Sequence, residues 1–240
     1  MRIIGYRNKS DIDIEFLDEN RYIKRHVQYT NFSKGEVKNP YDRTLVGVGY
    51  MGDGEYSSRT KGGKTNSSQE YIVWINMMTR CYDPKYKSKY PAYYGLITVC
   101  SEWHNFQNFA KWYNRNKYEV DGRLHVDKDI IDPSNTVYQP DKCLLVPQRI
   151  NELFHYKPNK DGLPSGISIT RKGRYSATWV GKSLGTYVTL EEAYEVYSEN
   201  KERTIKQVAD EYVDVIPRNV YNAMYSYVVD MKNDKNYKCA

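Results

Sequence analysis

The stretch from residue 166 to residue 206 constrains the fold more than any other part of this chain. Runs of strand length occur at residues 167–170, 175–179 and 182–187, with glycine turns between them. Thr189 and Glu192 then form the pattern of a capping box, which marks the start of a helix. Short strands joined by tight turns form antiparallel sheets. The segment therefore predicts a three-stranded sheet backed by one helix.

Charge is divided unevenly within this segment. Residues 189–216 carry eight acids against three bases, whereas residues 164–188 carry no acid and four bases: Arg171, Lys172, Arg174 and Lys182. One sheet face must pack on the helix, so the other face is free to meet a partner. Cations on strands can reach phosphates and guanine edges in the major groove of DNA, and an outward-facing Trp179 would contact sugars or thymine methyl groups. A merely solvated basic face is the alternative interpretation.

Four strings in this segment resemble the APETALA-two/ethylene-response-factor DNA-binding domain. They are G-I-S-I at 166–169, G-R-Y-S-A at 173–177, K-S-L-G-T-Y at 182–187 and T-L-E-E-A-Y at 189–194. The resemblance covers roughly residues 164–206 and implies a sheet that enters the major groove of double-stranded DNA.

The rest of the chain divides by composition. Period-two alternation at residues 12–16 and further short apolar runs up to residue 50 predict a small β domain over residues 1–56. We expect this domain to add DNA contacts or to mediate formation of a homodimer, and the sequence leaves both open. Residues 57–68 are rich in Gly, Ser, Thr and Lys and predict a basic flexible linker, with phosphate contact as the alternative function.

The middle of the chain has helix signals followed by a strand–loop–strand–helix pattern. Apolar residues at helical spacing predict a helix from residue 69 to 81 and a second helix from residue 101. Strands are expected at 124–126 and 143–146, and Pro147 takes the favoured first position of a helix that continues over residues 148–154. We place domain boundaries at 69–157 for this part and 164–232 for the C-terminal part, which ends in a further helix within residues 216–230.

The middle part is similar to bacteriophage HNH homing endonucleases, which often carry an appended module of the C-terminal kind. The resemblance covers roughly residues 69–156. It rests on W-I-N-M-M-T-R-C-Y at 74–82, V-C-S-E-W at 99–103, V-D-K-D-I at 126–130, Y-Q-P-D-K-C-L-L-V-P at 138–147 and I-N at 150–151.

This resemblance implies a ββα unit that holds one Mg²⁺ or Mn²⁺ ion beside the scissile phosphate. Asp127 matches the metal-side aspartate and Asn151 matches the last position of the motif, so both are expected metal ligands and catalytic residues. Lys128 stands where the family has its general-base histidine. Lys142 stands where the family has the asparagine that orients this histidine.

Three interpretations of the two lysines remain open. Lys128 acts as the base if its pKa is strongly lowered. Alternatively His125 replaces it, because residues 125 and 127 of a strand point to the same face, although a surface histidine without a role fits equally. Thirdly, the scaffold has lost cleavage and keeps DNA binding, with Lys128 and Lys142 neutralising a phosphate.

Composition and cysteine spacing bear on membrane insertion, structural zinc and cellular location. The 240 residues carry a net charge of +6, and no apolar run approaches the length of a membrane span. The separations between Cys81, Cys100, Cys143 and Cys239 fit no zinc-finger spacing, so we do not expect structural zinc, even with His104 as a fourth ligand. With no secretory signal, we expect a reducing compartment and no membrane partner. The resemblance to bacteriophage proteins implies the cytoplasm of a phage-infected bacterium.

Together these features predict an α+β protein of three small modules. The predicted function is that of a DNA-binding, phage-type protein of the homing-endonuclease class, which cuts or nicks duplex DNA with a divalent metal ion. The alternative is a catalytically inactive DNA-binding regulator on a degenerate HNH scaffold. A third option, an interaction module without a nucleic-acid role, disagrees with the uneven charge of the last module.

Overall fold

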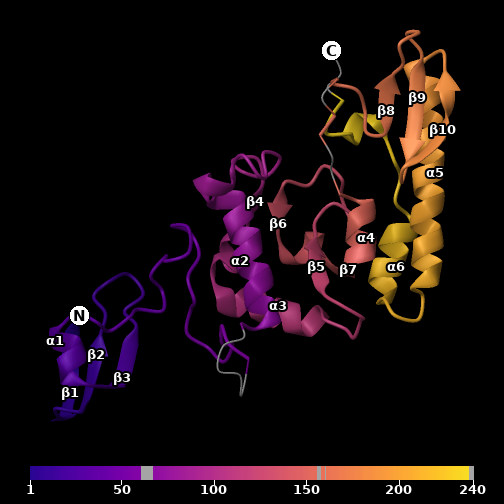
Figure 1. Ribbon diagram of the computed structural model, residues 1–240. Helices are drawn as coiled ribbons and strands as arrows, with labels where there is room; N and C mark the ends of the chain where they lie inside the picture. The colour runs from indigo at the N-terminus through magenta and orange to yellow at the C-terminus, as the bar shows by residue number, and fades with distance from the viewer. Residues whose placement is uncertain (61–66, 156–157, 160, 238–240) are drawn as a thin grey trace. The chain divides into compact units, whose positions relative to one another are not determined.

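Figure 1 shows the computed structural model, which describes residues 1–60, 67–155, 158–159 and 161–237. The chain packs as two compact units, residues 1–111 and residues 112–240. Both units combine helices with small separate sheets, so the chain has an α+β fold, as predicted. Within the described ranges, none of the helices has the length and apolar character needed to cross a lipid bilayer.

The first unit begins with an antiparallel sheet of three strands. These are β1 (Arg2–Asn8), β2 (Asp11–Glu15) and β3 (Ile23–Val27), and β2 is the central strand. The alternation that predicted a strand at residues 12–16 has its physical basis in a buried face formed by Ile12, Ile14 and Phe16. A short helix, α1 (Tyr29–Ser33), follows β3.

The apolar run at residues 45–50 is a tight turn, whereas its sequence suggested a strand. Val46 and Gly47 adopt positive φ values of 48° and 74°, which reverse the chain direction. Leu45 therefore meets Gly49 in an isolated bridge.

The helix predicted at residues 69–81 is α2 (Gln69–Tyr82), capped by the hydroxyl of Ser68 and burying Trp74 and Met78. The strand β4 (Thr98–Val99) and a 3₁₀ turn precede α3 (Phe106–Asn116). Of the predicted linker, residues 61–66 lie outside the described residues. The linker residues on either side of that gap pair with each other, because the main chains of Arg59 and Ser67 form a bridge.

The second unit begins with a strand–loop–strand–helix element. The strands β5 (Leu124–Asp127) and β7 (Leu144–Pro147) pair antiparallel, and α4 (Gln148–Leu153) follows β7 at once. Pro147 ends β7 and is the N-cap of α4, one residue before the first helical position that the sequence predicted for it. The loop between the two strands includes the short strand β6 (Val137–Tyr138).

The C-terminal sheet and helix occur as predicted. The strands β8 (Ile167–Ile169), β9 (Tyr175–Trp179) and β10 (Lys182–Tyr187) form an antiparallel sheet with β9 in the centre. Helix α5 (Leu190–Glu211) begins with a complete capping box of Thr189 and Glu192. Figure 1 shows the three strands lying along the first half of this helix.

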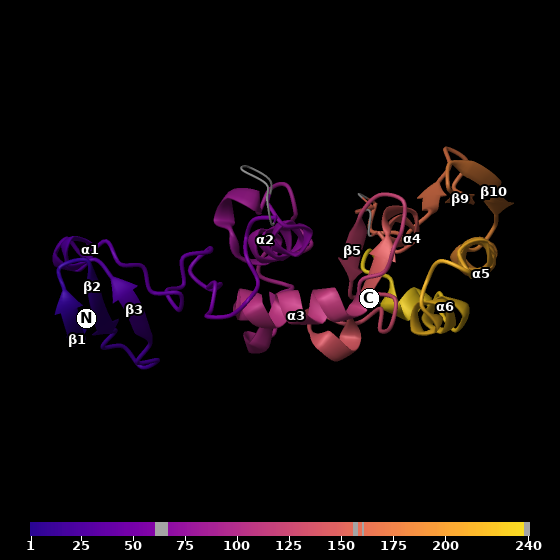
Figure 2. The same ribbon diagram turned by 90° about the horizontal axis from the view of Figure 1, so that it is seen from below.

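Helix α5 takes part in two hydrophobic cores. Its first half packs Ala193, Tyr194 and Tyr197 on the C-terminal sheet. Its second half packs Ile205 and other residues on the core of the β5–β7–α4 element. Helix α6 (Arg218–Tyr225) lies beside α5 in both views and contributes to this second core (Figure 2), not to the core of the sheet. One helix thus couples the C-terminal sheet to the β5–β7–α4 element.

Candidate metal centre and candidate nucleic-acid interface

The strands β5 and β7 fix which side chains face helix α4. Directly paired residues of an antiparallel ladder lie on the same face, and the pairs include His125 with Val146 and Asp127 with Leu144. Leu144 and Val146 share a core with Ile150 of α4. His125 and Asp127 therefore also lie on the face of the hairpin that α4 covers.

Asp127 ends β5 as a buried carboxylate, 6% exposed. Its Oδ1 accepts the backbone N–H groups of Asp129 and Ile130, both at 2.8 Å. Among the described residues, Oδ2 of Asp127 has no hydrogen-bond partner. Burial, reinforced by the nearby charge of Asp129, raises the pKa of Asp127 to about 6. A cation at Oδ2 would stabilise the ionised form that burial disfavours.

Asn151 lies in α4, next to the buried Ile150, and is partly buried itself. Its side chain makes no hydrogen bond to any other described residue. Because α4 packs against β5, Asn151 and Asp127 come from elements in contact on one face of the hairpin. One carboxylate and one amide oxygen fit Mg²⁺ or Mn²⁺, which prefer oxygen ligands and keep several waters or phosphate oxygens. Both predicted ligand residues thus offer oxygen atoms of the kind that this ion prefers.

Lys128 is engaged in a buried ion pair. Its side chain is 2% exposed, and Nζ donates to Oδ1 of Asp129 at 2.6 Å and to the carbonyl oxygen of Asn135 at 3.1 Å. Burial lowers the pKa of Lys128, while the charge of Asp129 opposes that shift. A general base must offer a free lone pair. A lysine held as the donor to a carboxylate does not offer one.

The loop after β5 is organised by an asparagine that the sequence analysis missed. The side-chain amide of Asn135 donates to the carbonyl oxygens of Lys128 at 3.2 Å and of Val137 at 2.9 Å, and its Oδ1 accepts the N–H of Val137. The preceding D-P-S-N string at 132–135 is a turn signature that could have indicated this role.

Lys142, predicted to contact DNA, is half-exposed and donates to Oδ2 of Asp132 at 3.1 Å. Exposed ion pairs of this kind are weak, so Lys142 can exchange Asp132 for a phosphate at small cost. Asp129 opposes a lowered pKa of Lys128, as expected for a close neighbour, and its Oδ1 also lies 2.9 Å from Nζ of Lys235, a contact that the sequence did not indicate.

The four cations of the C-terminal sheet are all exposed. Within the described part of the chain, none of them forms an ion pair with a carboxylate. Arg171, Lys172 and Arg174 lie around the turn before β9, whereas Lys182 pairs with Trp179 at the other end of that strand. The cations therefore occupy opposite ends of the sheet, about 17 Å apart along the five residues of β9.

Arg174 is close to the acidic helix without being neutralised by it. The pKa of Glu192 is lowered chiefly by hydrogen bonds from Thr189, and the charge of Arg174 is the smallest of the contributions. The guanidinium of Arg174 remains exposed.

Trp179 was predicted to face outward and contact DNA, but its side chain points toward helix α5. Its Nε1 donates to Oγ1 of Thr204 at 2.9 Å, and its ring meets Tyr197 edge to face. Strand alternation explains this orientation, because Trp179 shares the inner face of β9 with the fully buried Ala177. Trp179 belongs to the core of the C-terminal module.

The outer face of the sheet is lined by hydroxyl groups. Ser176 and Thr178 alternate with the inward residues of β9, and the register pairs Ser168 with Ser176, Thr178 with Ser183, and Ser176 with Thr186. These five hydroxyls make no hydrogen bond to another side chain in the described ranges. The Y-S-A-T-W alternation of β9 carried this signal, which the sequence analysis did not use.

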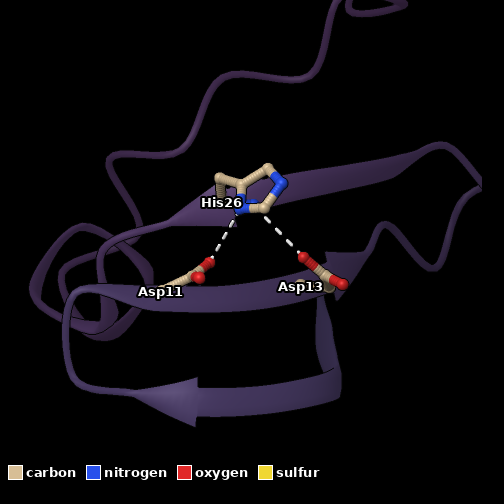
Figure 3. Close-up of side chains that lie close together, drawn as sticks. All are labelled: Asp11, Asp13 and His26. Carbon is tan, nitrogen blue, oxygen red and sulfur yellow. Dashed lines mark hydrogen bonds and ion pairs between the residues drawn. The ribbon is translucent and has the colours of Figure 1, made fainter.

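A second group of candidate metal ligands lies in the N-terminal sheet. Figure 3 shows Asp11 and Asp13 of β2 facing His26 of β3. Arg7 already binds both carboxylates, with its guanidinium 2.7 Å from Asp11 and 2.5 Å from Asp13. Nδ1 of His26 pairs with Asp11 at 2.9 Å. The hydrogen bonds from Arg7 lower the pKa of Asp11 and of Asp13. This arrangement is an ion-pair network in which the guanidinium of Arg7 balances the charge of the two carboxylates.

The cysteines are placed as follows. Cys81 and Cys143 are buried, Cys100 is half-buried, and Cys239 lies outside the described residues. Nε2 of His104 lies 3.0 Å from the carbonyl oxygen of Val99. In the portion of the chain that the structure describes, the Asp11–Asp13–His26 group is the one cluster of three acidic, histidine or cysteine ligands.

No protein-family model, no curated protein and no solved structure matches this chain.

Proposed function

We propose that this chain is a DNA-binding protein of the bacteriophage HNH homing-endonuclease class, which cuts or nicks double-stranded DNA with Mg²⁺ or Mn²⁺ in the cytoplasm of an infected bacterium. One observation carries the proposal. Asp127 is a buried carboxylate on the α4 face of a ββα element, and one of its oxygens has no hydrogen-bond partner among the described residues. That element shares helix α5 with a sheet of exposed cations that form no ion pair with any described carboxylate.

In this proposal Asp127 and Asn151 hold the metal ion. When bound, such an ion stabilises negative charge on the scissile phosphate and increases the acidity of a bound water. Oδ1 of Asp127 remains with the N–H groups of Asp129 and Ile130, which orient Oδ2 toward the ion. His125 shares the face of Asp127, and we assign it the role of accepting a proton from the attacking water.

The C-terminal sheet is the main DNA-binding surface in this proposal. Arg171, Lys172 and Arg174 contact phosphates at one end of the sheet and Lys182 at the other, because all four are exposed and none pairs with an acid that the structure describes. The hydroxyls between them contact phosphate oxygens and base edges.

A plasmid assay tests cleavage. Supercoiled plasmid is incubated with the full chain and Mg²⁺ or Mn²⁺, and the relaxed and linear forms are quantified. We expect nicking by the wild-type chain and its loss in Asp127→Asn, Asn151→Ala and His125→Ala. An exposed control, Lys34→Gln, should retain it. Wild-type chain without any nicking, or nicking that survives Asp127→Asn, contradicts the assignment.

The salt dependence of duplex binding tests the sheet. The logarithm of the association constant should fall linearly with that of the salt concentration, by about 0.9 per phosphate contact. The triple variant Arg171→Ala/Lys172→Ala/Arg174→Ala should reduce the slope by about 2.7. The double variant Lys34→Gln/Lys38→Gln removes two exposed charges elsewhere and should leave the slope unchanged. An unchanged slope in the triple variant removes the sheet from the interface.

A second candidate function is that of a non-catalytic DNA-binding regulator. The observation that favours it is the buried ion pair of Lys128, which occupies the position of the family's base with a group that cannot accept a proton. This candidate predicts duplex binding with the same salt slope but no nicking with either metal ion. The plasmid assay therefore separates the two functions.

A further inference from the structure

The segment that follows helix α2 is unusually rich in tyrosine and lysine. Residues 83–94 read D-P-K-Y-K-S-K-Y-P-A-Y-Y, with four tyrosines, three lysines and one acid. The acid is Asp83, whose carboxylate accepts the N–H of Lys85 and starts the 3₁₀ turn Pro84–Tyr86. The carboxylate of Asp83 therefore caps the turn and forms no ion pair with the lysines of this segment that the structure describes.

Consecutive turns bring the tyrosine rings together. The N–H of Tyr90 donates to the carbonyl oxygen of Tyr86 at 2.8 Å, and the N–H of Tyr93 donates to that of Tyr90 at 3.0 Å. The rings of Tyr86 and Tyr90 are consequently stacked, with centroids 6.0 Å apart and planes at 17°. Tyr93 meets Tyr90 edge to face at 6.3 Å.

Basic groups lie over these rings. Nζ of Lys89 is 5.3 Å from the ring centre of Tyr90 and 5.8 Å from that of Tyr86. Nζ of Lys87 is 5.9 Å from the ring of Tyr94, and the guanidinium of Arg80 is 5.1 Å from that of Tyr93. We call this group the tyrosine–lysine patch; it consists of Arg80, Tyr86, Lys87, Lys89, Tyr90, Tyr93 and Tyr94.

The lysines of the patch keep their charge available. Lys87 and Lys89 are exposed, and no carboxylate among the described residues pairs with either of them. A contact with a ring face is weaker than a charge-assisted hydrogen bond, so an anion can draw each ammonium group off its tyrosine. The ring face beneath is then open to a flat group.

A ligand that uses both features must offer anions and flat rings in alternation. Single-stranded nucleic acid does so, because its phosphates alternate with bases whose faces are unpaired and can stack on aromatic side chains. A duplex hides its base faces, and an acidic protein or membrane would use the lysines alone. We infer that the tyrosine–lysine patch binds a short stretch of single-stranded nucleic acid, with phosphates at Lys87 and Lys89 and a base on Tyr86 or Tyr90. This inference is independent of duplex binding by the C-terminal sheet.

The test uses the full chain and a fluorescent oligonucleotide of about twelve thymidines, within the range of known site sizes. Binding is measured by anisotropy in the wild type and in the sheet variant Arg171→Ala/Lys172→Ala/Arg174→Ala. We expect the sheet variant to bind the duplex much more weakly than the wild type does and to keep at least half of its affinity for the oligonucleotide. Loss of both together would mean that the sheet is the sole nucleic-acid surface and would overturn the inference.

Patch variants then test the two kinds of contact. Lys87→Gln/Lys89→Gln should reduce the salt slope of oligonucleotide binding by about 1.4, because each phosphate contact to a single strand contributes about 0.7. The control Lys34→Gln/Lys38→Gln should not change it. Tyr90→Leu should weaken binding by about five-fold to one hundred-fold, as loss of one stacked base does, whereas Tyr90→Phe should bind like the wild type.

A spectroscopic readout separates stacking from a folding defect. An oligonucleotide that carries 2-aminopurine should lose fluorescence on binding to the wild type and to Tyr90→Phe, because its base stacks on a ring. If Tyr90→Leu quenches the fluorescence as strongly as the wild type does, bases do not stack there and the inference fails. It fails equally if vesicles of acidic lipid bind the patch and the oligonucleotide does not.

Discussion

The ammonium group of Lys128 lies 2.6 Å from the carboxylate of Asp129, although the two residues are neighbours in the sequence. Neighbours in a strand point to opposite faces, so this contact requires the chain to turn directly after β5. Asp127 produces the turn by accepting the N–H groups of Asp129 and Ile130. The residue proposed to bind metal and the ion pair beside it are therefore parts of one folded loop.

Replacement of Lys128 by methionine should destabilise the protein. The carboxylate of Asp129 would keep Lys235 but lose its buried partner, and breaking a buried pair on one side costs about 3 kcal/mol at the low end of the usual range. Lys142→Met removes a half-exposed pair and should cost less than about 1 kcal/mol. Urea unfolding compares the two. If Lys128→Met is as stable as Lys142→Met but abolishes nicking, Lys128 is catalytic and not structural.

The pKa of Asp127, raised to about 6 by burial, predicts that Asp127→Asn stabilises the metal-free protein. The native state holds the proton more tightly than the unfolded state, so wild-type stability falls as pH rises from about 4 through 6. At pH 8 the variant should be more stable by up to about 3 kcal/mol, and the gain should fade toward pH 4.

Thermal unfolding over that pH range checks this prediction, with Mg²⁺ as a second variable. Mg²⁺ should raise the melting temperature of the wild type and leave that of Asp127→Asn unchanged. A variant that is less stable than the wild type at pH 8 without metal would show that the carboxylate is needed for folding, and would count against a metal-binding role.

Trp179→Phe should lower the stability of the protein, whereas Arg174→Ala should lower its affinity for duplex DNA. Loss of the hydrogen bond from Nε1 of Trp179 to Thr204 should cost about 1 kcal/mol of stability while duplex affinity stays within two-fold of the wild type. Thr204→Val, which removes the acceptor, should reproduce that loss. Arg174→Ala should weaken duplex binding without a change in stability. If the folded Trp179→Phe variant binds duplex DNA weakly, Trp179 contacts DNA and this prediction is wrong.

The hydroxyl face of the C-terminal sheet should contribute to sequence preference. Thr178 and Ser183 are cross-strand neighbours. The substitutions Thr178→Val and Ser183→Ala remove their hydroxyls without removing charge, so the salt slope of duplex binding should remain that of the wild type. The difference in affinity between a selected target and a random duplex should shrink. An unchanged difference, measured by competition, would show that these hydroxyls do not read bases.

The N-terminal sheet should be sensitive to acid. Arg7 lowers the pKa of Asp11 and Asp13, so their ionised forms stabilise the sheet above about pH 4, and this stabilisation is lost as pH falls through the lowered values. Arg7→Gln should abolish most of that pH dependence. Arg2→Gln removes the exposed pair with Glu15 and serves as the control. Denaturant unfolding at pH 7 and pH 3 provides the comparison, and equal pH dependence in all three proteins would contradict the prediction.

Local pattern was enough to predict most of the elements that build the candidate sites. The capping box of Thr189 and Glu192, the strand alternation around Ile12 and the helix-start position after Pro147 each act within a few residues, so they can be read without a fold. The same holds for the exposure of Arg171 and Lys172, because charged residues in a glycine turn have nothing to bury against. The turn at Val46 was not predicted, because a β-branched residue rarely adopts the positive φ that Val46 has here.

Contacts between distant residues decided the remaining features. Alternation puts Trp179 on the same face as Ala177 but does not tell which face meets the helix, so the inward position of Trp179, beside Thr204 25 residues away, follows only from the packed module. Lys235 reaches Asp129 across 106 residues, and no spacing rule could bring them together. Helix α5 serves two cores because its length exceeds that of the sheet it covers, and only the packed chain shows what occupies its second half. Burial and charge pairing are properties of the whole fold, so local pattern cannot fix them.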